Sequence, residues 1–287
     1  MAGIFEPSLS VRTTPFIGSS LRAKSQCRAE KLILRATKGP PPSTRLGNNE
    51  TVTEATLLAL DVDGTLLDPT LLDPVGVSPE VAQAVRDAAD SGIHVALATG
   101  RQAHATVAFA QALGLQHGWL SSTFGAVTLR LDPTLASGFE IVRSATFDPR
   151  PLIERLAYRP DVMIAVDDPG VGFLVDRHWP AGELVEPLTL IGEREITSTT
   201  SLMARSTTLS RDELVAAAQA DGLSCEPFAL RGASWINVTP LGHTKKTGIE
   251  GIAEMLGVSQ ANVIAVGAPV SSFSSGMPNN NTARIPF

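Results

Sequence analysis

The alternation of apolar runs with helical patterns constrains the fold of this chain more than any other feature. One continuous apolar run covers residues 56–60, another covers 93–98, and polar residues follow both. A helix start lies between them, with Ser78 as N-cap and a proline next to it, and a second helical pattern covers 102–113. Such runs are typical of parallel strands buried on both faces. The alternation therefore predicts an α/β fold with a doubly wound, Rossmann-like parallel sheet.

The same alternation returns near the C-terminal end, after a long stretch of another kind. A helical pattern at 246–256 precedes an apolar run at 262–266. The stretch before them mixes short strand and helix patterns, divided by proline and glycine. We therefore expect a core made of residues 55–128 and 236–287, with an α+β cap inserted at 129–235.

Residues 1–54 differ in composition from the rest of the chain. They are rich in Ser, Thr, Arg and Lys, poor in acids, and run through a proline-rich segment at 39–44. This composition is typical of a transit peptide, which would direct the protein to a plastid or mitochondrion. A disordered tail or an upstream extension of a gene model has the same composition, and a cytoplasmic protein then follows. Both interpretations remain open at this point.

The charge distribution argues against nucleic-acid and membrane partners. Residues 1–50 hold eight basic and three acidic side chains, so with a total of −6 the other 237 residues carry a net charge of −11. An acidic body repels the phosphates of nucleic acids and anionic lipids. No apolar run approaches the roughly 20 residues of a spanning helix, so we expect a soluble protein. The two cysteines, Cys27 and Cys225, fit a reducing compartment without requiring one.

Two carboxylates directly follow the first apolar run. Asp61 and Asp63 occupy alternate positions, and Gly64 comes next. Carboxylates this close are costly unless a cation neutralises them, and Mg²⁺ suits because it takes oxygen ligands beside a phosphate. The pair would then divide into a nucleophile on phosphorus and a general acid/base. Taken alone, so short a motif is more often a surface turn with Gly64 at positive φ.

Two further segments carry groups that suit a phosphate. Thr99 and Gly100 end the second apolar run and open a helix, where a hydroxyl and free N–H groups can hold an anion. An ordinary capping threonine is the alternative. Lys245 stands at a helix start, where the helix dipole disfavours a cation, and this indicates a role in balancing the charge of a carboxylate and a phosphate. A solvated pair with Lys246 is the alternative there.

Taken together, the three segments resemble the haloacid dehalogenase-like (HAD) phosphatase superfamily. Within it they resemble the Cof-type hydrolases, which have a large inserted C2-type cap. The first family motif matches Asp61–Leu67, the second matches Ala98–Arg101, and the third matches Pro240–Val258 with Lys245 at the motif lysine. The resemblance spans residues 56–267.

The resemblance implies an enzyme that hydrolyses phosphate monoesters. Asp61 would attack phosphorus to form an aspartyl phosphate, and Asp63 would protonate the leaving alkoxide and then activate water. Lys245 would offset the phosphoryl charge, and Mg²⁺ would bind Asp61 and the backbone carbonyl of Asp63. The substrate would be a small phosphorylated metabolite such as a sugar phosphate. The expected phosphate-binding residues are Thr99, Gly100 and Gly64.

The sequence departs from the family pattern in the fourth motif. Gly267 is followed by Ala268, where the family has a metal-binding aspartate, and 277–280 holds a displaced fragment of that motif. Losing an anionic ligand weakens metal binding. An alternative function is therefore a catalytically impaired phosphatase-like chain that at most binds a ligand or partner, with 268–287 a splicing or gene-model variant. A phosphomutase is a third possibility.

Smaller departures and ordinary side chains complete the analysis. Phe124 stands where the family commonly has asparagine, and Lys246 where it commonly has glycine. His104 has no metal-ligand spacing and is interpreted as a surface or packing residue. Asp167 and Asp168, within the expected cap, are interpreted as part of a solvated charged loop.

Overall fold

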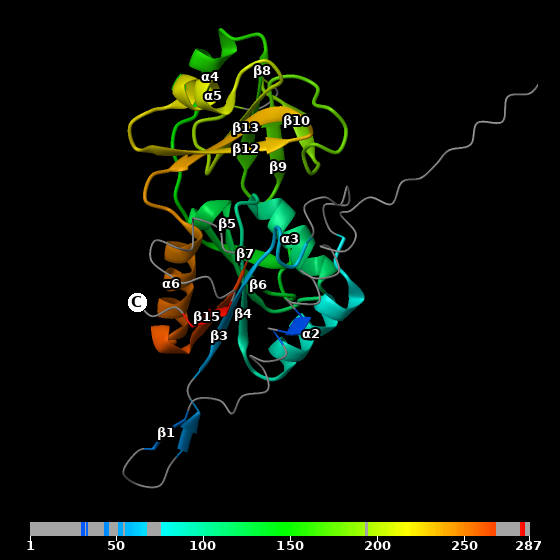
Figure 1. Ribbon diagram of the computed structural model, residues 1–287, viewed down its shortest axis with the longest axis vertical. Coiled ribbons are helices and arrows are strands. Elements are labelled where there is room, and N and C mark those ends of the chain that lie inside the picture. The colour runs from blue at the N-terminus through cyan, green and yellow to red at the C-terminus, as the bar shows by residue number, and fades with distance from the viewer. Residues whose placement is uncertain are drawn as a thin grey trace, which may run out of the picture.

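The computed structural model places two units one above the other (Figure 1). It describes residues 30–31, 33, 43–45, 51–53, 55–67, 76–192, 195–267 and 282–284. Strands of these residues form a seven-stranded sheet, a six-stranded sheet and a small antiparallel hairpin of β1 (Ser43–Arg45) and β2 (Thr51–Thr53).

The seven-stranded sheet forms the lower unit in Figure 1. Its strand order is β15 (Thr282–Arg284), β14 (Val263–Val266), β3 (Leu57–Asp61), β4 (His94–Ala98), β5 (Gly118–Ser122), β6 (Val127–Leu131) and β7 (Phe139–Ser144). Strands β14, β3, β4 and β5 are parallel, and β15, β6 and β7 join antiparallel. All five residues of β3 are buried, as the apolar run predicts.

Helices cover both faces of this sheet, which confirms the predicted doubly wound fold. Helices α2 (Pro79–Asp90) and α3 (Ala103–Ala112) pack on the face that holds Leu58 and Leu60, whereas α6 (Lys245–Leu256) packs against Leu57 and Ala59. The side chain of Ser78 accepts a hydrogen bond from the Val81 amide, so α2 begins where the capping pattern predicts.

The six-stranded sheet forms the upper unit. Its strand order is β10 (Leu188–Leu190), β9 (Gly172–Val175), β8 (Val162–Asp168), β11 (Leu202–Ser206), β13 (Ala233–Pro240) and β12 (Leu223–Leu230). All neighbours are antiparallel except β9 and β10. Helices α4 (Arg150–Ala157) and α5 (Arg211–Ala218) pack on one face, and Trp179 packs on the other, against Trp235.

The residues at which the chain passes from one sheet to the other differ from the expected boundaries of core and cap. Strand β6 crosses the expected boundary at residue 128, β7 lies within the expected cap at 129–235, and both extend the first sheet. Strand β13 continues past 236 within the second sheet. The reason is that the alternation of strands and helices ends after β5, while the core sheet continues as an antiparallel meander. We use "cap" below for the unit with the six-stranded sheet and "core" for the unit with the seven-stranded sheet.

Both connections between core and cap leave the core at one place. After β7, the Ala145 amide donates to the Ala126 carbonyl at 2.8 Å. On the return, Thr244 lies directly against Gly125, because a Cβ atom at Gly125 would overlap the Thr244 carbonyl. The two crossings therefore flank the adjacent residues Gly125 and Ala126.

The described residues of the expected extension at 1–54 include one core residue and a hairpin. Ile33 is fully buried in the core cluster around α2 and β3, and β1 and β2 form the hairpin. The rest of this extension, and the fourth-motif segment 268–281, lie outside the described residues. Among the helices that the structure describes, none combines the length and apolar character needed to cross a membrane.

Candidate active site

The carboxyl ends of three neighbouring parallel strands form the candidate site. Asp61 is the last residue of β3, Thr99 directly follows β4, and Gly267 directly follows β14. A Cβ atom at Gly267 would lie 3.2 Å from that of Asp61, so the end of β14 comes close to the Asp61 side chain. Ligands of open α/β sheets bind at this edge.

Asp61 is the most buried acidic group at this edge, with 1% of the residue exposed. Lys245 Nζ donates to its Oδ1 at 2.7 Å, and the Val62 amide donates to the same oxygen at 3.0 Å. Thr65 Oγ1 donates to Oδ2 at 3.2 Å. Burial raises the pKa of Asp61 above its ordinary value, while Lys245 lowers it and Asp63 raises it further.

Lys245 reaches Asp61 because it occupies the first position of α6. Thr244 caps this helix in a capping box with Thr247, so the helix start is fixed without an acidic residue. The Lys245 side chain is 9% exposed and forms a buried ion pair with Asp61. Lys245 therefore lies beside a carboxylate, as the sequence predicts. The ion pair with Asp61 explains why a cation stands at a helix start, where the helix dipole disfavours it.

Asp63 lies beside Asp61 and pairs with a different cation. Arg101 donates from Nη2 to Asp63 Oδ1 at 2.7 Å and from Nε to both carboxylate oxygens at 3.1 Å. Thr99 Oγ1 donates to Asp63 Oδ2 at 3.4 Å and accepts from the Arg101 amide at 3.1 Å. The Thr99 hydroxyl therefore contacts both partners of the Asp63–Arg101 pair, and Arg101 orients the carboxylate by a fork of hydrogen bonds.

Arg101 is the residue of this group that sequence reasoning missed. The sequence placed it in the second motif but gave it no role. A signal was available, since Arg101 directly precedes Gln102, the N-cap of α3, and a cation near a helix start opposes the helix dipole, as it does at Lys245. The four charged groups, Asp61, Asp63, Lys245 and Arg101, give this edge a formal net charge of zero.

Gly64 and Gly100 have conformational and packing roles in the structure. Gly64 has φ +80°, and its amide donates to the Leu67 carbonyl at 2.7 Å, so this N–H is engaged within the turn. A Cβ atom at Gly100 would overlap the ring of Phe124. Both residues were expected to bind phosphate. In the structure the Gly64 amide is engaged in the turn, and the Phe124 ring lies over the Gly100 backbone.

The segment after β5 holds the second and third motifs together. Thr123 and Phe124 have φ +53° and +54°, a region that costs side chains other than glycine about 1–2 kcal/mol per residue. Their amides donate to the carbonyls of Arg101 at 2.7 Å and Thr99 at 3.1 Å. Gly125, the next residue, lies against Thr244. This strained segment thus fixes the distance between the Thr99–Arg101 loop and the start of α6.

The donor chemistry of this edge suits a hard cation. Asp61 Oδ2 accepts from Thr65 and retains lone-pair capacity, and the backbone carbonyl of Asp63 is a further oxygen donor. Mg²⁺ is commonly held by one or two carboxylates together with waters and a substrate phosphate, so these donors fit it. Within the described ranges, no group of three acidic, histidine or cysteine side chains is arranged to hold a metal. Position 268 lies outside these ranges.

Comparison with known proteins agrees with this geometry. Residues 58–143, which include the first two motifs, match the model of the haloacid dehalogenase-like hydrolase family. This match agrees with the resemblance drawn from the first two motifs, and the matched family is one of hydrolases. The third motif, at 240–258, lies outside the matched residues. No curated protein matches the chain.

Solved structures share the fold of this chain. A haloacid dehalogenase-like hydrolase from Bacteroides thetaiotaomicron is 18% identical with a TM-score of 0.59, covering 75% of this chain and 82% of its own. A HAD/COF-like hydrolase from Plasmodium vivax is 19% identical with a TM-score of 0.56, covering 82% and 81%. A HAD subclass IIB sugar phosphatase is 17% identical with a TM-score of 0.52, covering 75% and 81%. At these identities the likeness is one of fold, core and cap together.

Proposed function

We propose that this chain is a Mg²⁺-dependent phosphate monoester hydrolase that works through an aspartyl phosphate on Asp61. The observation that carries the proposal is the buried Asp61–Lys245 pair at 2.7 Å, with Asp63 and Thr99 beside it. A carboxylate with a fixed lysine at its side can attack phosphorus while the lysine offsets the charge of the phosphoryl oxygens.

Asp63 is the proposed general acid and base. Arg101 and Thr99 orient its carboxylate, and its side chain is 42% exposed, so it can exchange protons with a leaving group or with water. It would donate a proton to the departing alkoxide, and the same carboxylate would then take a proton from the water that hydrolyses the aspartyl phosphate. The Thr99 hydroxyl would contact the phosphoryl oxygens.

Asp61 Oδ2 and the backbone carbonyl of Asp63 would hold the Mg²⁺. When bound, this ion neutralises charge on the transferring phosphoryl group. Because Lys245 and Arg101 already balance the two carboxylates, the described residues attract a cation less than an unbalanced acidic cluster would. We therefore expect weak Mg²⁺ binding, with an affinity that depends on bound phosphate.

The proposed substrate class is a small phosphorylated metabolite, such as a sugar phosphate. It is supported by the cap above the strand ends, which can enclose a small molecule, and by the fold shared with a sugar phosphatase. Hydrolysis rates for a panel of sugar phosphates, nucleotides and aryl phosphates would rank these classes. Preference for an aryl phosphate over all sugar phosphates would contradict the sugar proposal.

The test of the proposed function is Mg²⁺-dependent hydrolysis of an aryl phosphate by the purified chain. Asp61→Asn removes the nucleophile while keeping the size of the side chain, and we expect it to abolish phosphate release, by at least about 10³-fold. Circular dichroism and thermal melting control for folding. Turnover of the wild-type chain that Asp61→Asn leaves unchanged would contradict the proposal.

A second candidate is a catalytically impaired chain that binds a phosphorylated ligand without hydrolysing it. The observation that favours it is Ala268, which cannot supply the acidic metal ligand that the fourth family motif provides. Absence of turnover in a folded wild-type chain, together with phosphate binding that Lys245→Met weakens, would support this candidate over the hydrolase.

A further inference from the structure

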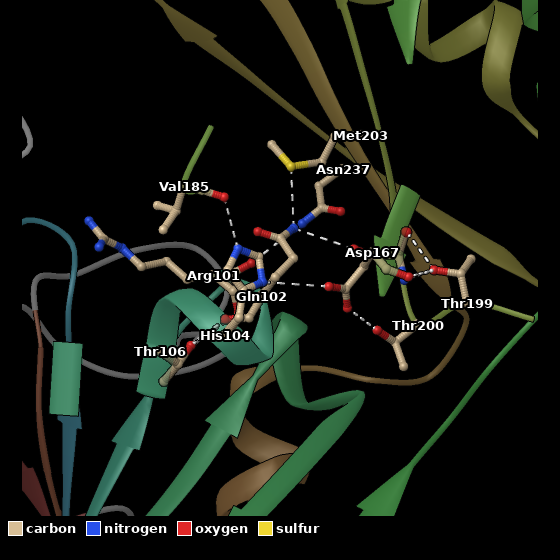
Figure 2. A network of polar contacts seen from close by, with 12 residues as sticks. Arg101, Gln102, His104, Thr106, Asp167, Val185, Thr199, Thr200, Met203 and Asn237 are labelled. Atoms are coloured by element: carbon tan, nitrogen blue, oxygen red, sulfur yellow. Dashed lines mark hydrogen bonds and ion pairs between the residues drawn. The ribbon is translucent and has the colours of Figure 1, made fainter. Parts of the chain in front are cut away.

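A seam of polar contacts joins the start of α3 in the core to the cap (Figure 2). Gln102 Nε2 donates to Ser201 Oγ and to Met203 Sδ, each at 3.3 Å. Asn237 Nδ2 donates to the Gly100 carbonyl at 3.4 Å. These contacts start one residue on either side of Arg101, so the seam adjoins the candidate active site.

The centre of the seam holds two buried ionisable side chains, one from each unit. His104 of α3 and Asp167 of β8 are 7% and 0% exposed, and His104 Nδ1 lies 4.0 Å from Asp167 Oδ1. Neither atom has a hydrogen-bond partner among the described residues. The interpretation of Asp167 as part of a solvated loop is therefore wrong, because β8 carries its side chain into the interface.

The second nitrogen of His104 fixes the protonation of the ring. Nε2 lies 3.1 Å from the backbone carbonyl oxygen of Val185 in the cap, and a carbonyl can only accept. Nε2 must therefore carry hydrogen, so a neutral His104 has a bare Nδ1 that faces Asp167. A carboxylate oxygen opposite a bare nitrogen is repulsive, whereas a protonated carboxyl could donate to it.

The surroundings of the pair favour its neutral form. Burial lowers the pKa of His104 and raises that of Asp167 to about 7. Thr200 of β11 donates to the other oxygen of Asp167, and Phe173 of β9 contacts His104 edge-on. Asp168 of β8 is the charged neighbour that acts on both pKa values, and it raises both.

We propose that His104 and Asp167 are positioning residues that pass one proton between them as the cap closes on the core. In the open form His104 is an imidazolium and Asp167 a carboxylate, both in water. On closure the N–H bond at Nδ1 breaks, an O–H bond forms at Asp167, and two neutral groups are buried. The proton stays within the pair. At pH values between 3.8 and 6.5, which are the ordinary pKa values of the two groups, closure therefore neither takes up nor releases a proton.

This exchange positions the active site through α3. His104 lies on the first turn of α3, and Arg101, which orients Asp63, directly precedes Gln102. Asp61 and Thr99 are both buried, and the proposed parting of the two units would open them to substrate. The proposal rests on the proposed function for its consequence in catalysis, but the closure itself can be measured without substrate.

The test is the pH dependence of closure in the full-length chain. Spin labels at Tyr158→Cys in the cap and Asp90→Cys in the core, with both native cysteines changed to serine, report the distance between units. Both label positions are exposed. We expect the closed-to-open ratio of this otherwise wild-type chain to stay constant from about pH 4.5 to 6.5.

Two single variants should introduce pH dependence of opposite sign. In Asp167→Asn, His104 must shed its proton to close, so the closed-to-open ratio falls about tenfold for each pH unit below about 6.5. In His104→Gln, Asp167 must take up a proton to close, so the ratio falls about tenfold for each pH unit as pH rises from about 4 towards about 7. The double variant should be flat again and less closed.

Several results would overturn the proposal. It fails if the labelled parent chain opens by about tenfold per pH unit, or if the two variants share the same sign of pH dependence. Asp167→Asn keeps the shape of the side chain, so it carries the test alone if His104→Gln does not fold. Opposite pH dependences in a chain without phosphatase activity would refute the proposed function and leave the proton exchange standing.

Discussion

At the residue scale, the candidate site consists of two ion pairs that different parts of the chain bring together. Asp61 pairs with Lys245 and Asp63 with Arg101, across sequence separations of 184 and 38 residues. The sequence predicted that Asp61, Asp63 and Lys245 belong together, because each stands at a strand end or helix start. It could not predict the Asp63–Arg101 fork, because the direction of a long side chain depends on tertiary packing.

The first prediction concerns this fork. Arg101→Ala leaves Asp63 without its orienting partner, and we expect kcat for phosphate ester hydrolysis to fall about tenfold to a hundredfold. Arg101→Lys keeps the charge but loses the fork, so its kcat should lie between those of the wild type and Arg101→Ala. Steady-state kinetics of the purified variants measure this.

A surface arginine provides the matched control for this change. Arg143 of β7 forms an exposed ion pair with Glu254 of α6 at 3.9 Å. Arg143→Ala should leave kcat within about a factor of two, because exposed ion pairs contribute little. If Arg101→Ala behaves like this control, the fork does not position Asp63 for the reaction.

At the element scale, the sequence predicted elements well where caps and apolar runs coincide. Helix α2 begins after Ser78, and α6 ends at Gly257 with φ +64°. Strands β4 and β14 lie within the apolar runs, and β3 extends one residue past its run, to Asp61. The expected boundary at 128/129 cut through β6 and placed β7 in the cap, because the regular alternation of strands and helices ends there. Nothing local tells whether an antiparallel hairpin extends the existing sheet or starts another. Only pairing with β5 decides this.

The second prediction compares two glycines with positive φ. Gly125 and Gly138 have φ +89° and +76°, but a Cβ atom would overlap the Thr244 carbonyl only at Gly125, while Gly138 faces open space. Gly138→Ala should therefore lower the free energy of unfolding by about 1 kcal/mol, through backbone strain alone. Gly125→Ala should cost clearly more and also weaken phosphate binding, because it displaces the start of α6.

Urea denaturation of the two alanine variants isolates the steric effect, since the backbone strain is matched. Phosphate binding, measured by calorimetry, reports on the position of Lys245. Equal losses of stability in both variants, with unchanged phosphate binding, would mean that the contact between Gly125 and Thr244 does not hold the third motif in place.

At the scale of the whole molecule, the two units have separate hydrophobic cores and meet through polar contacts. The clusters around α2, α3 and α6 contain residues of the core sheet, and those around α4, α5 and Trp235 contain residues of the cap. The seam contributes hydrogen bonds from Gln102 and Asn237. Polar interfaces of this kind couple the folding of two units weakly.

The third prediction follows from these separate cores. Leu97 in the core and Leu156 in the cap are both fully buried, so changing either to alanine should cost about 2–5 kcal/mol. We expect two unfolding transitions, with Leu97→Ala shifting one and Leu156→Ala the other. In a Trp119→Phe background, which removes the tryptophan of the core, fluorescence of Trp179 and Trp235 reports the cap, and circular dichroism reports both units. A single transition that both variants shift equally would contradict this.

The shared crossing point at Gly125 and Ala126 determines how the two units can move. Because both connecting segments pass this point, the cap is fixed to the core at a single pivot and can swing about it, but it cannot slide along the strand ends. Lys245 directly follows Thr244, which lies against Gly125 at the pivot, whereas His104 contacts the cap at the Val185 carbonyl. Swinging the cap therefore leaves the Asp61–Lys245 pair intact and separates the seam, so the site can admit a substrate without dismantling its nucleophile.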